Sequence, residues 1–401
     1  MTLVQKEPKS IKIWTTDIKK VYLGSTQVRP KPRTFTISWT EQSNMSSWWT
    51  YSDDAAWLTA GSTDFDEFFG YSWVRLNASW VETAEITQTA SGWAGKLDIT
   101  QLWTLTSWDN VMIKFPVRWI KMTKSWSVVT LSITEELNKA WYQYYAFQNT
   151  WNVDTNTENT PTKQLYLGAY FSIDSSGYAR SRSWWTSTSW FTLTDAITKS
   201  TNNGTGWTVM WWYQWNLINA MYMMKYGNPD AAWVIWLGTY NGGNGSTDVL
   251  TNATGTANNA VRLFWLENRW RRWGYWAILW WVFSASQNWH YWAALHWFYW
   301  NPVPTNYNYK FIWTLWGWTP NWLKSIKGNN KEMFAAAERW EARQWNTYYR
   351  VEQVYGTNTT YPYYVPVVWC RYASDGRANI LSLLFIMLGN SDSHPSRLMY
   401  L

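Results

Sequence analysis

Tryptophan placement is the feature that most constrains what this chain can fold into. The chain holds 40 Trp among 401 residues, and many of them stand in turn strings where the backbone favours glycine. Lys124-Ser125-Trp126-Ser127 separates two alternating segments, residues 117–123 and 128–134. Trp126 is therefore predicted at a hairpin tip, where a residue that tolerates positive φ is required.

The same placement recurs at other turn strings. It is found at Trp108, Trp141, Trp151 and the pair Trp184-Trp185. One hypothesis is that the gene uses UGA as a glycine codon, as some ultrasmall candidate-phylum bacteria and their phages do, and that UGA has been translated as Trp. The alternative is a chain that is genuinely rich in Trp, as a carbohydrate binder would be.

The recoding hypothesis makes a structural prediction. Several loop Trp, Trp126 among them, should have positive φ or project into solvent, because an L-residue with a large side chain is strained there unless it is glycine. UGG codons at Trp126, Trp184 and Trp185 would reject the hypothesis.

Charge and cysteine content exclude several classes of protein. The net charge of +7 is spread along the chain, whereas nucleic-acid binders concentrate charge on one face, so no nucleic-acid partner is expected. A single cysteine, Cys370, rules out an internal disulfide and a cysteine-based zinc cluster. We expect neither a metal nor another cofactor.

Hydropathy predicts no membrane insertion. No apolar stretch approaches the ~18 residues that a membrane span requires. The polar and charged residues 1–10 do not resemble a secretory signal, so any export is expected through particle assembly or another route.

The pattern of hydrophobic residues predicts an α+β fold with long loops. Two short strands are expected around Gly24-Ser25 and a short helix or turn at residues 64–71. The strongest helical periodicity spans residues 207–226 and ends at Gly227-Asn228-Pro229. Further strands are expected at residues 111–117, 120–133, 142–147, 165–170 and 365–388.

Three regions are predicted along the chain. Residues 1–45 form an N-terminal β attachment module and linker, and residues 46–104 a small mixed connecting region. Residues 105–401 form the main domain, where long loops on a compact scaffold suggest a binding role.

One string within the main domain resembles a known family. With Trp265 taken as glycine, Leu263-Phe264-Trp265-Leu266-Glu267-Asn268-Arg269-Trp270 resembles the central motif of the C-type-lectin or formylglycine-generating-enzyme-like fold. This fold is found in phage tail receptor-binding proteins and in variable proteins of diversity-generating retroelements. Arg271-Arg272 stands where the family usually has Gly-Asn, so the local turn departs from the pattern.

Other stretches resemble the same family in the same order. Residues 166–170 are similar to its Tyr-Leu-Gly-Ala-Tyr strand, residues 218–228 to its main helix, and residues 396–401 to its closing strand. Residues 21–28 resemble an attachment segment at the start of phage structural proteins.

The resemblance implies a C-type-lectin-like domain whose binding face lies just before the last strand, at residues 370–395. Polar side chains of this stretch are the candidate ligand-binding residues, and their mixed chemistry suits an adaptable contact surface. They are Arg371, Tyr372, Ser374, Asp375, Arg377, Asn379, Ser382, Asn390, Asp392 and His394.

The implied function is non-catalytic binding of a host or neighbour-cell surface protein or glycan. The protein would be displayed on a phage tail or a cell surface as a homo-oligomer, a trimer for example, in which avidity multiplies weak contacts. Two alternatives remain. One is a Trp-rich carbohydrate-binding adhesin, and the other is an enzyme of the formylglycine-generating-like fold, whose chemistry needs a Cys pair that Cys370 alone does not supply.

Three weaker patterns have structural explanations beside functional ones. A set of acidic residues could bind calcium, although a solvated turn or helix start explains their presence as well: Asp53, Asp54, Asp64, Asp66 and Glu67. Three neighbouring arginines could bind an anion or belong to a solvated loop: Arg269, Arg271 and Arg272. Three tryptophans near His296 could stack on sugar rings, but under the recoding hypothesis some of them are glycines and the stacking platform disappears: Trp292, Trp297 and Trp300.

Overall fold

The computed structural model describes the body of the chain and a set of strands around it. The described residues are 12–13, 16–17, 21–23, 26–28, 32–41, 49–77, 82–85, 109–147, 164–170, 172–182, 193–210, 212–228, 262–264, 266–267, 277–278, 282–285, 290–294, 310–314, 321–330, 333–334, 336–340, 348–355, 363–368, 383–387 and 397–400.

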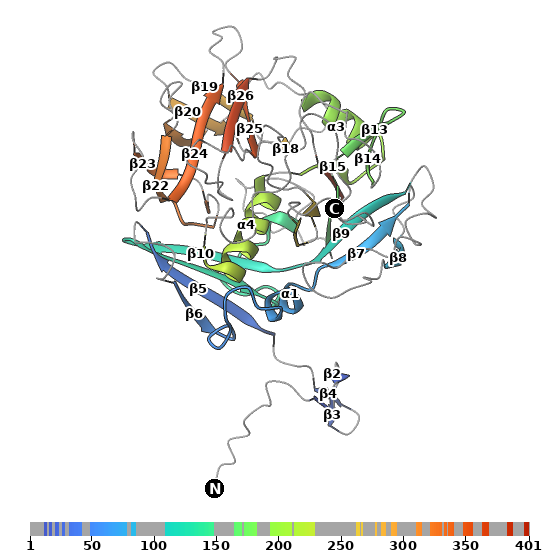
Figure 1. Ribbon diagram of the computed structural model, residues 1–401, viewed down its shortest axis with the longest axis vertical. Helices are drawn as coiled ribbons and strands as arrows, with labels where there is room; N and C mark the ends of the chain where they lie inside the picture. Colours follow the sequence, from blue (N-terminus) through green and yellow to red (C-terminus); the bar gives the residue numbers. More distant parts are fainter. Residues whose placement is uncertain are drawn as a thin grey trace, which may run out of the picture.

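The fold is α+β, as predicted, with antiparallel sheets and few helices (Figure 1). A four-stranded sheet has the order β10 (Trp119–Ser125), β11 (Val128–Thr134), β5 (Thr34–Thr40) and β6 (Trp49–Asp53). The predicted hairpin is confirmed, since Ser125 pairs with Val128 and leaves Trp126 and Ser127 as its two-residue turn.

A six-stranded sheet lies beside it. Its order is β15 (Trp207–Val209), β27 (Leu398–Tyr400), β12 (Gln164–Gly168), β9 (Asn110–Pro116), β7 (Ser72–Leu76) and β8 (Glu82–Glu85). The last strand of the chain, β27, is therefore an interior strand that pairs with both β12 and β15.

A nine-stranded sheet is built from the C-terminal part of the chain. Its order is β21 (Lys310–Thr314), β20 (His290–Ala294), β19 (Val282–Ala285), β25 (Tyr363–Val368), β26 (Leu383–Met387), β24 (Tyr348–Tyr355), β22 (Asn321–Ile326) and β23 (Ala336–Trp340), and β18 (Ala277–Ile278) also pairs with β25. Among the described strands of the protein, the pair β24–β26 is the one parallel pair.

Four two-stranded ribbons complete the strands: β1 (Lys12–Ile13) with β2 (Thr16–Asp17), β3 (Val21–Leu23) with β4 (Thr26–Val28), β13 (Ser172–Ser175) with β14 (Tyr178–Ser181), and β16 (Arg262–Leu263) with β17 (Leu266–Glu267). The pair β3–β4 encloses Gly24-Ser25 and confirms the predicted N-terminal hairpin.

The helices differ in part from the expectation. The predicted short helix is α1 (Asp64–Phe69), and the main helix is α4 (Trp212–Tyr226). Helix α4 ends at Gly227 as predicted, with φ of 63°, but its predicted start was wrong because Trp207–Val209 pairs with β27 as strand β15. Helix α3 (Leu193–Thr201) was not predicted.

The strand expected at residues 142–147 was also wrong in most of its length. Gln143 makes one isolated bridge to Ile120, and the 3-10 helix η1 (Tyr145–Phe147) follows at once. The aromatic residues produce a strand-like pattern, but Tyr144 packs on Trp119, with ring centroids 4.3 Å apart. Tertiary packing therefore overrides local propensity here.

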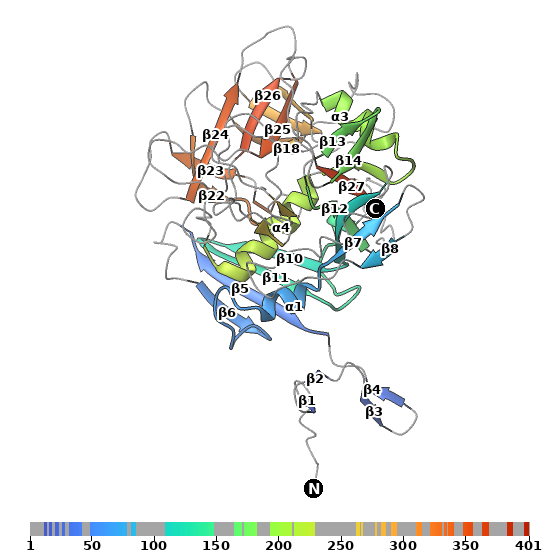
Figure 2. The same cartoon turned by 45° about the vertical axis from the view of Figure 1, so that its right-hand side comes forward.

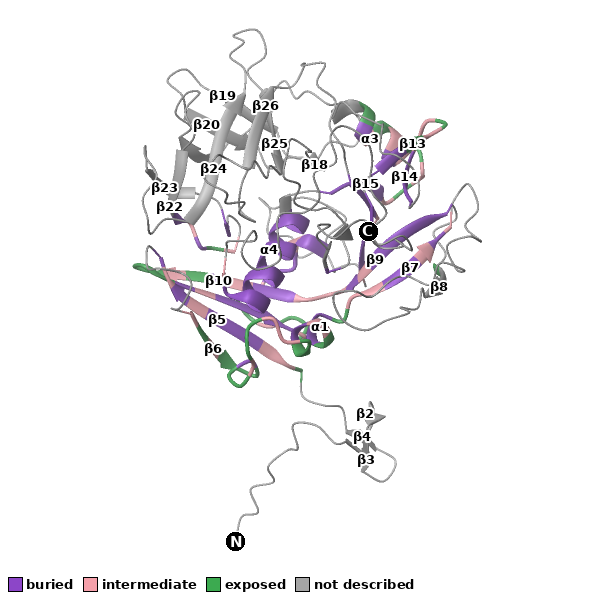
Figure 3. Ribbon diagram, viewed as in Figure 1, coloured by how far each residue is buried: buried purple, intermediate pink, exposed green. Residues whose placement is uncertain are grey.

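Helix α4 forms the centre of the molecule. In Figures 1 and 2 it lies among the sheets, and Figure 3 shows it buried along its length. Every described side chain from Tyr213 to Tyr226 is buried, which is the condition of a helix covered on all sides. The polar residues Gln214, Asn216 and Asn219 are buried with the apolar ones.

Two contacts secure the C-terminal end of α4. The Nζ atom of Lys225 lies 2.6 Å from both carboxylate oxygens of Asp66 in α1. Gly227 receives the indole of Trp49 so closely that an added Cβ would lie 2.5 Å from a ring carbon. Only glycine fits this left-handed position, which explains the predicted helix stop.

Two arginines and one glutamate join the end of β11 to α1. Arg33 donates from Nε and Nη2 to the carboxylate of Glu135 at 3.2 and 2.9 Å, and Arg118 adds a contact at 3.4 Å. Both guanidinium groups lie over the ring of Phe68. Burial alone raises the pKa of Glu135, but the hydrogen bonds and charge of Arg33 and the charge of Arg118 outweigh it and lower that pKa.

This lowered pKa predicts acid sensitivity. Because the folded-state pKa of Glu135 lies below the ordinary value of 4.5, its contribution to stability is present above that value and is lost as pH falls through the folded pKa. We expect Glu135→Gln to lower the melting temperature at neutral pH and to flatten its decline below about pH 4.5.

Differential scanning calorimetry across pH 3–7 measures this effect. The control is Glu136→Gln, since Glu136 is half exposed in an i,i+3 pair with Lys139 and should retain the parent's pH profile. An unchanged acid profile in Glu135→Gln would contradict the assignment.

Candidate functional site

The ten candidate ligand-binding residues lie outside the described residues. Arg371, Tyr372, Ser374, Asp375, Arg377, Asn379 and Ser382 fall between β25 and β26, and Asn390, Asp392 and His394 fall between β26 and β27. The structure therefore describes the strands that carry these segments and not the candidate side chains. Cys370 also lies outside the described residues.

The register of β25 and β26 shows where the first segment is attached. Val368 pairs with Leu383, and Tyr364 pairs with Met387, in an antiparallel arrangement. Residues 369–382 thus connect the end of β25 to the start of β26, and these two strand ends are neighbours in the nine-stranded sheet. The strand region expected at residues 365–388 contains two strands, β25 and β26, with this segment between them.

The second segment leaves from the opposite end of β26. Met387 is the last residue of that strand, four residues along from Leu383, which is about 13 Å at the ~3.3 Å rise of a strand. The candidate face predicted as one stretch is therefore attached at two different ends of one strand. Sequence proximity alone cannot reveal this, because a strand separates its two ends in space.

The second segment ends at a buried anchor in the six-stranded sheet. Arg397, 1% exposed, donates from Nη1 to the carbonyl oxygen of Gly168 in β12. Tyr400 packs against Trp207 and Tyr166, with ring centroids 5.1 and 5.8 Å apart. Sequence reasoning missed Arg397, because an arginine beside a polar segment carries no sign of burial.

The string at residues 263–270 that resembles the C-type-lectin family lies partly within the described residues. Its residues form the hairpin β16–β17, and Phe264 has φ of 48°. The Phe264 ring packs against Phe69 at 5.5 Å and Tyr71 at 5.6 Å between centroids. The described part of the motif therefore packs against the C-terminal end of α1. Trp265 and the three candidate arginines lie outside the described residues.

The structural prediction for the turn tryptophans is confirmed at the two described positions. Trp126 has φ of 54° and Trp141 has φ of 70°, and their side chains are 95% and 82% exposed. Trp126 is the first of two central residues of its hairpin turn, the position that glycine takes in type II′ turns. Trp108, Trp151, Trp184 and Trp185 lie outside the described residues.

The acidic residues considered as a calcium site make separate contacts within the fold. Asp53 accepts from the Thr36 hydroxyl at 2.6 Å, and Asp54 accepts from the Thr34 amide at 2.8 Å. Asp66 binds Lys225, and Glu67 lies 3.7 Å from Arg33. These carboxylates therefore have partners within the fold: Asp53 and Asp54 link β6 and the turn after it to β5, and Asp66 links α1 to α4.

In the described part of the chain, no three His, Cys, Asp or Glu side chains come together as a metal site, and no helix is long and apolar enough to cross a membrane. Comparison with protein-family models, curated proteins and solved structures finds no match.

Proposed function

We propose that this chain is a non-catalytic ligand-binding protein whose binding residues lie near the C-terminus. The observation that carries the proposal is the arrangement of the chain along its long axis. Strands β1–β4 lie at one end, and β25 and β26, which flank the candidate residues, lie toward the other (Figures 1 and 2). Such an arrangement suits attachment at one end and recognition at the other.

The finer assignment, a C-type-lectin-like domain, is supported by the type of element at each resembling stretch. Residues 166–168 lie in strand β12, residues 218–226 in helix α4 and residues 398–400 in the closing strand β27. We extend the proposal to display on a phage tail or cell surface as a homo-oligomer, with a host or neighbour-cell protein or glycan as ligand. The candidate face would be the segment that a retroelement diversifies.

Cell binding tests the function directly. We expect the fluorescently labelled full-length protein to bind a panel of bacterial cells saturably, and the variant Arg371→Ala/Tyr372→Ala/Arg377→Ala to lose at least about tenfold in affinity, since aromatic and arginine contacts dominate such interfaces. The control Thr50→Ala/Ser52→Ala changes two exposed residues of β6 and should bind as the parent does.

Two outcomes would contradict the proposal. One is the absence of saturable binding to any cell or arrayed glycan. The other is equal binding by the triple variant and the β6 control, when both keep the parent's circular dichroism spectrum.

A carbohydrate-binding adhesin is the second candidate, favoured by one observation. Three indoles project far into solvent, those of Trp57, Trp126 and Trp141, which are 81%, 95% and 82% exposed. Exposed aromatic faces can stack on sugar rings. If this function holds, a glycan array should show binding by the parent chain that is abolished by Trp57→Ala/Trp126→Ala/Trp141→Ala and retained when Arg371, Tyr372 and Arg377 are changed.

A further inference from the structure

An ion pair holds the end of strand β22 against the four-stranded sheet. Glu41 follows β5 and is 4% exposed, and its Oε1 atom accepts from the Ile326 amide at 2.8 Å. Lys124 in β10 donates from Nζ to the Ile326 carbonyl oxygen at 2.9 Å and lies 2.6 Å from Oε2 of Glu41. The two backbone polar groups of Ile326 are therefore bound by two oppositely charged side chains that also bind each other.

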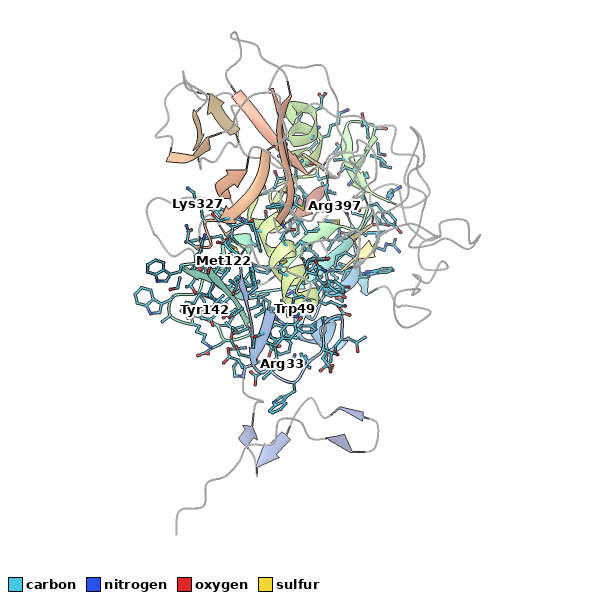
Figure 4. The ribbon with its side chains drawn as sticks, turned by 60° about the vertical axis from the view of Figure 1, so that its left-hand side comes forward. Arg33, Trp49, Met122, Tyr142, Lys327 and Arg397 are labelled. Carbon is cyan, nitrogen blue, oxygen red and sulfur yellow. The ribbon has the colours of Figure 1, made fainter. Side chains whose placement is uncertain are left out.

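A second contact lies a few residues further along. Asn330 accepts at Oδ1 from the Met122 amide and donates from Nδ2 to the Trp141 carbonyl oxygen, both at 2.8 Å. Strand β10 is an edge strand of its sheet, so the Asn330 amide satisfies an edge N–H group that would otherwise need another partner. Figure 4 labels Met122 of β10 and Lys327, the residue after β22, in the same part of the view.

A glycine permits the close approach. Gly328 has φ of 62°, and an added Cβ would lie 2.8 Å from the Cβ of Lys124. The Gly328 amide donates to the Met333 carbonyl oxygen at 3.0 Å, and Met333 and Phe334 are 1% and 0% exposed. We call residues 326–330 with 333–334 the docking turn.

We propose that the docking turn fixes the nine-stranded sheet to the four-stranded sheet, and that Glu41 and Lys124 are the positioning residues of this attachment. A buried charge is costly without its partner, so the ion pair favours one docked arrangement over displaced ones. Strands β22, β24 and β26 are consecutive neighbours, so the attachment also sets the position of Leu383, the first described residue after residues 369–382. The attachment is independent of the proposed ligand binding, because all its contacts lie within the chain.

Two glycine variants of the full-length chain isolate the docking contact. Gly328→Ala adds both left-handed strain and a clash with Lys124, whereas Gly177→Ala adds the strain alone, since Gly177 has φ of 86° and nothing within 4 Å of its added Cβ. By hydrogen-exchange mass spectrometry, we expect Gly328→Ala to speed exchange of peptides covering residues 321–334 by roughly tenfold or more and to leave β5 and β11 protected. Gly177→Ala should leave residues 321–334 as in the parent.

A charge variant tests the positioning residues. Glu41→Gln keeps an oxygen acceptor for the Ile326 amide but removes the charge that pairs with Lys124, so it should also speed exchange at residues 321–334, while Glu136→Gln should not. Small-angle scattering should show a larger radius of gyration for Glu41→Gln than for Glu136→Gln. The proposal is overturned if exchange at residues 321–334 is unchanged in Glu41→Gln, or if β5 and β11 lose protection to the same extent. Glu41→Gln decides the matter if Gly328→Ala does not fold.

Discussion

Replacing Trp126 and Trp141 by glycine is expected to stabilise the protein by about 1 kcal/mol at each site. A residue with a side chain loses roughly 1–2 kcal/mol in the left-handed conformation, and glycine offsets part of that gain through its greater freedom in the unfolded chain. Both indoles are almost fully exposed, so their removal sacrifices little packing.

Thermal and urea unfolding of the two single variants and the double variant measure this effect. Trp57→Gly is the matched control, because Trp57 is 81% exposed but is absent from the described non-glycine residues with positive φ. It should lose up to ~1 kcal/mol through backbone entropy. Equal destabilisation by all three single substitutions would contradict the prediction.

The nucleotide sequence of the gene tests the underlying hypothesis. We propose that UGA, read as glycine in the source, encodes the turn residues 126 and 141. UGA at those positions, with a reverse-transcriptase gene and a near-copy of the coding stretch for residues 370–395 nearby, would support a retroelement-diversified binding protein. UGG at those positions and no such neighbours would favour the sugar-stacking adhesin.

Trp207→Ala is expected to have the opposite effect and to cost about 3–5 kcal/mol, the range for removing a buried aromatic side chain. Trp207 is 1% exposed and belongs to the core cluster with Tyr166 and Leu398. It also packs on Tyr400 across the β15–β27 pair. Its loss therefore weakens the attachment of the last strand.

Trp207→Phe separates packing from hydrogen bonding. The buried Nε1 atom of Trp207 has no hydrogen-bond partner among the described residues, so phenylalanine removes an unsatisfied donor together with part of the ring. We expect it to cost less than half as much as Trp207→Ala in urea unfolding. A cost for Trp207→Ala near that of Trp57→Gly would show that the indole is not part of a packed core.

Local patterns predicted the hairpins well and some neighbouring elements poorly. The β10–β11 hairpin and the stop of α4 at Gly227 depend on turn chemistry and alternation that a few residues contain. The segment at residues 207–209 continues the helical periodicity, yet it forms a strand because β27, nearly 200 residues later, offers it a backbone partner. Residues 142–147 fail as a strand for the same reason, since distant packing partners decide their conformation.

The candidate binding residues show the same division. Their polar composition and their place before a closing strand were visible in the sequence, and the flanking strands β25, β26 and β27 are confirmed. Their separation onto two ends of β26 depends on strand register. The division of the chain at residues 45 and 104 stays a prediction, although β5 and β6, from either side of residue 45, pair with each other.

The sequence by itself determined the α+β class, the turn positions that demand glycine-like backbone and the helix stop before Pro229, because backbone sterics and residue periodicity act over a few neighbouring residues. Only the tertiary structure decided which strands share a sheet, that Arg397 and Glu41 are buried, and that Ile326 is held between Lys124 and Glu41. These facts depend on contacts between residues hundreds of positions apart, and the free energy of burying a charge exists only once its partner has been brought beside it.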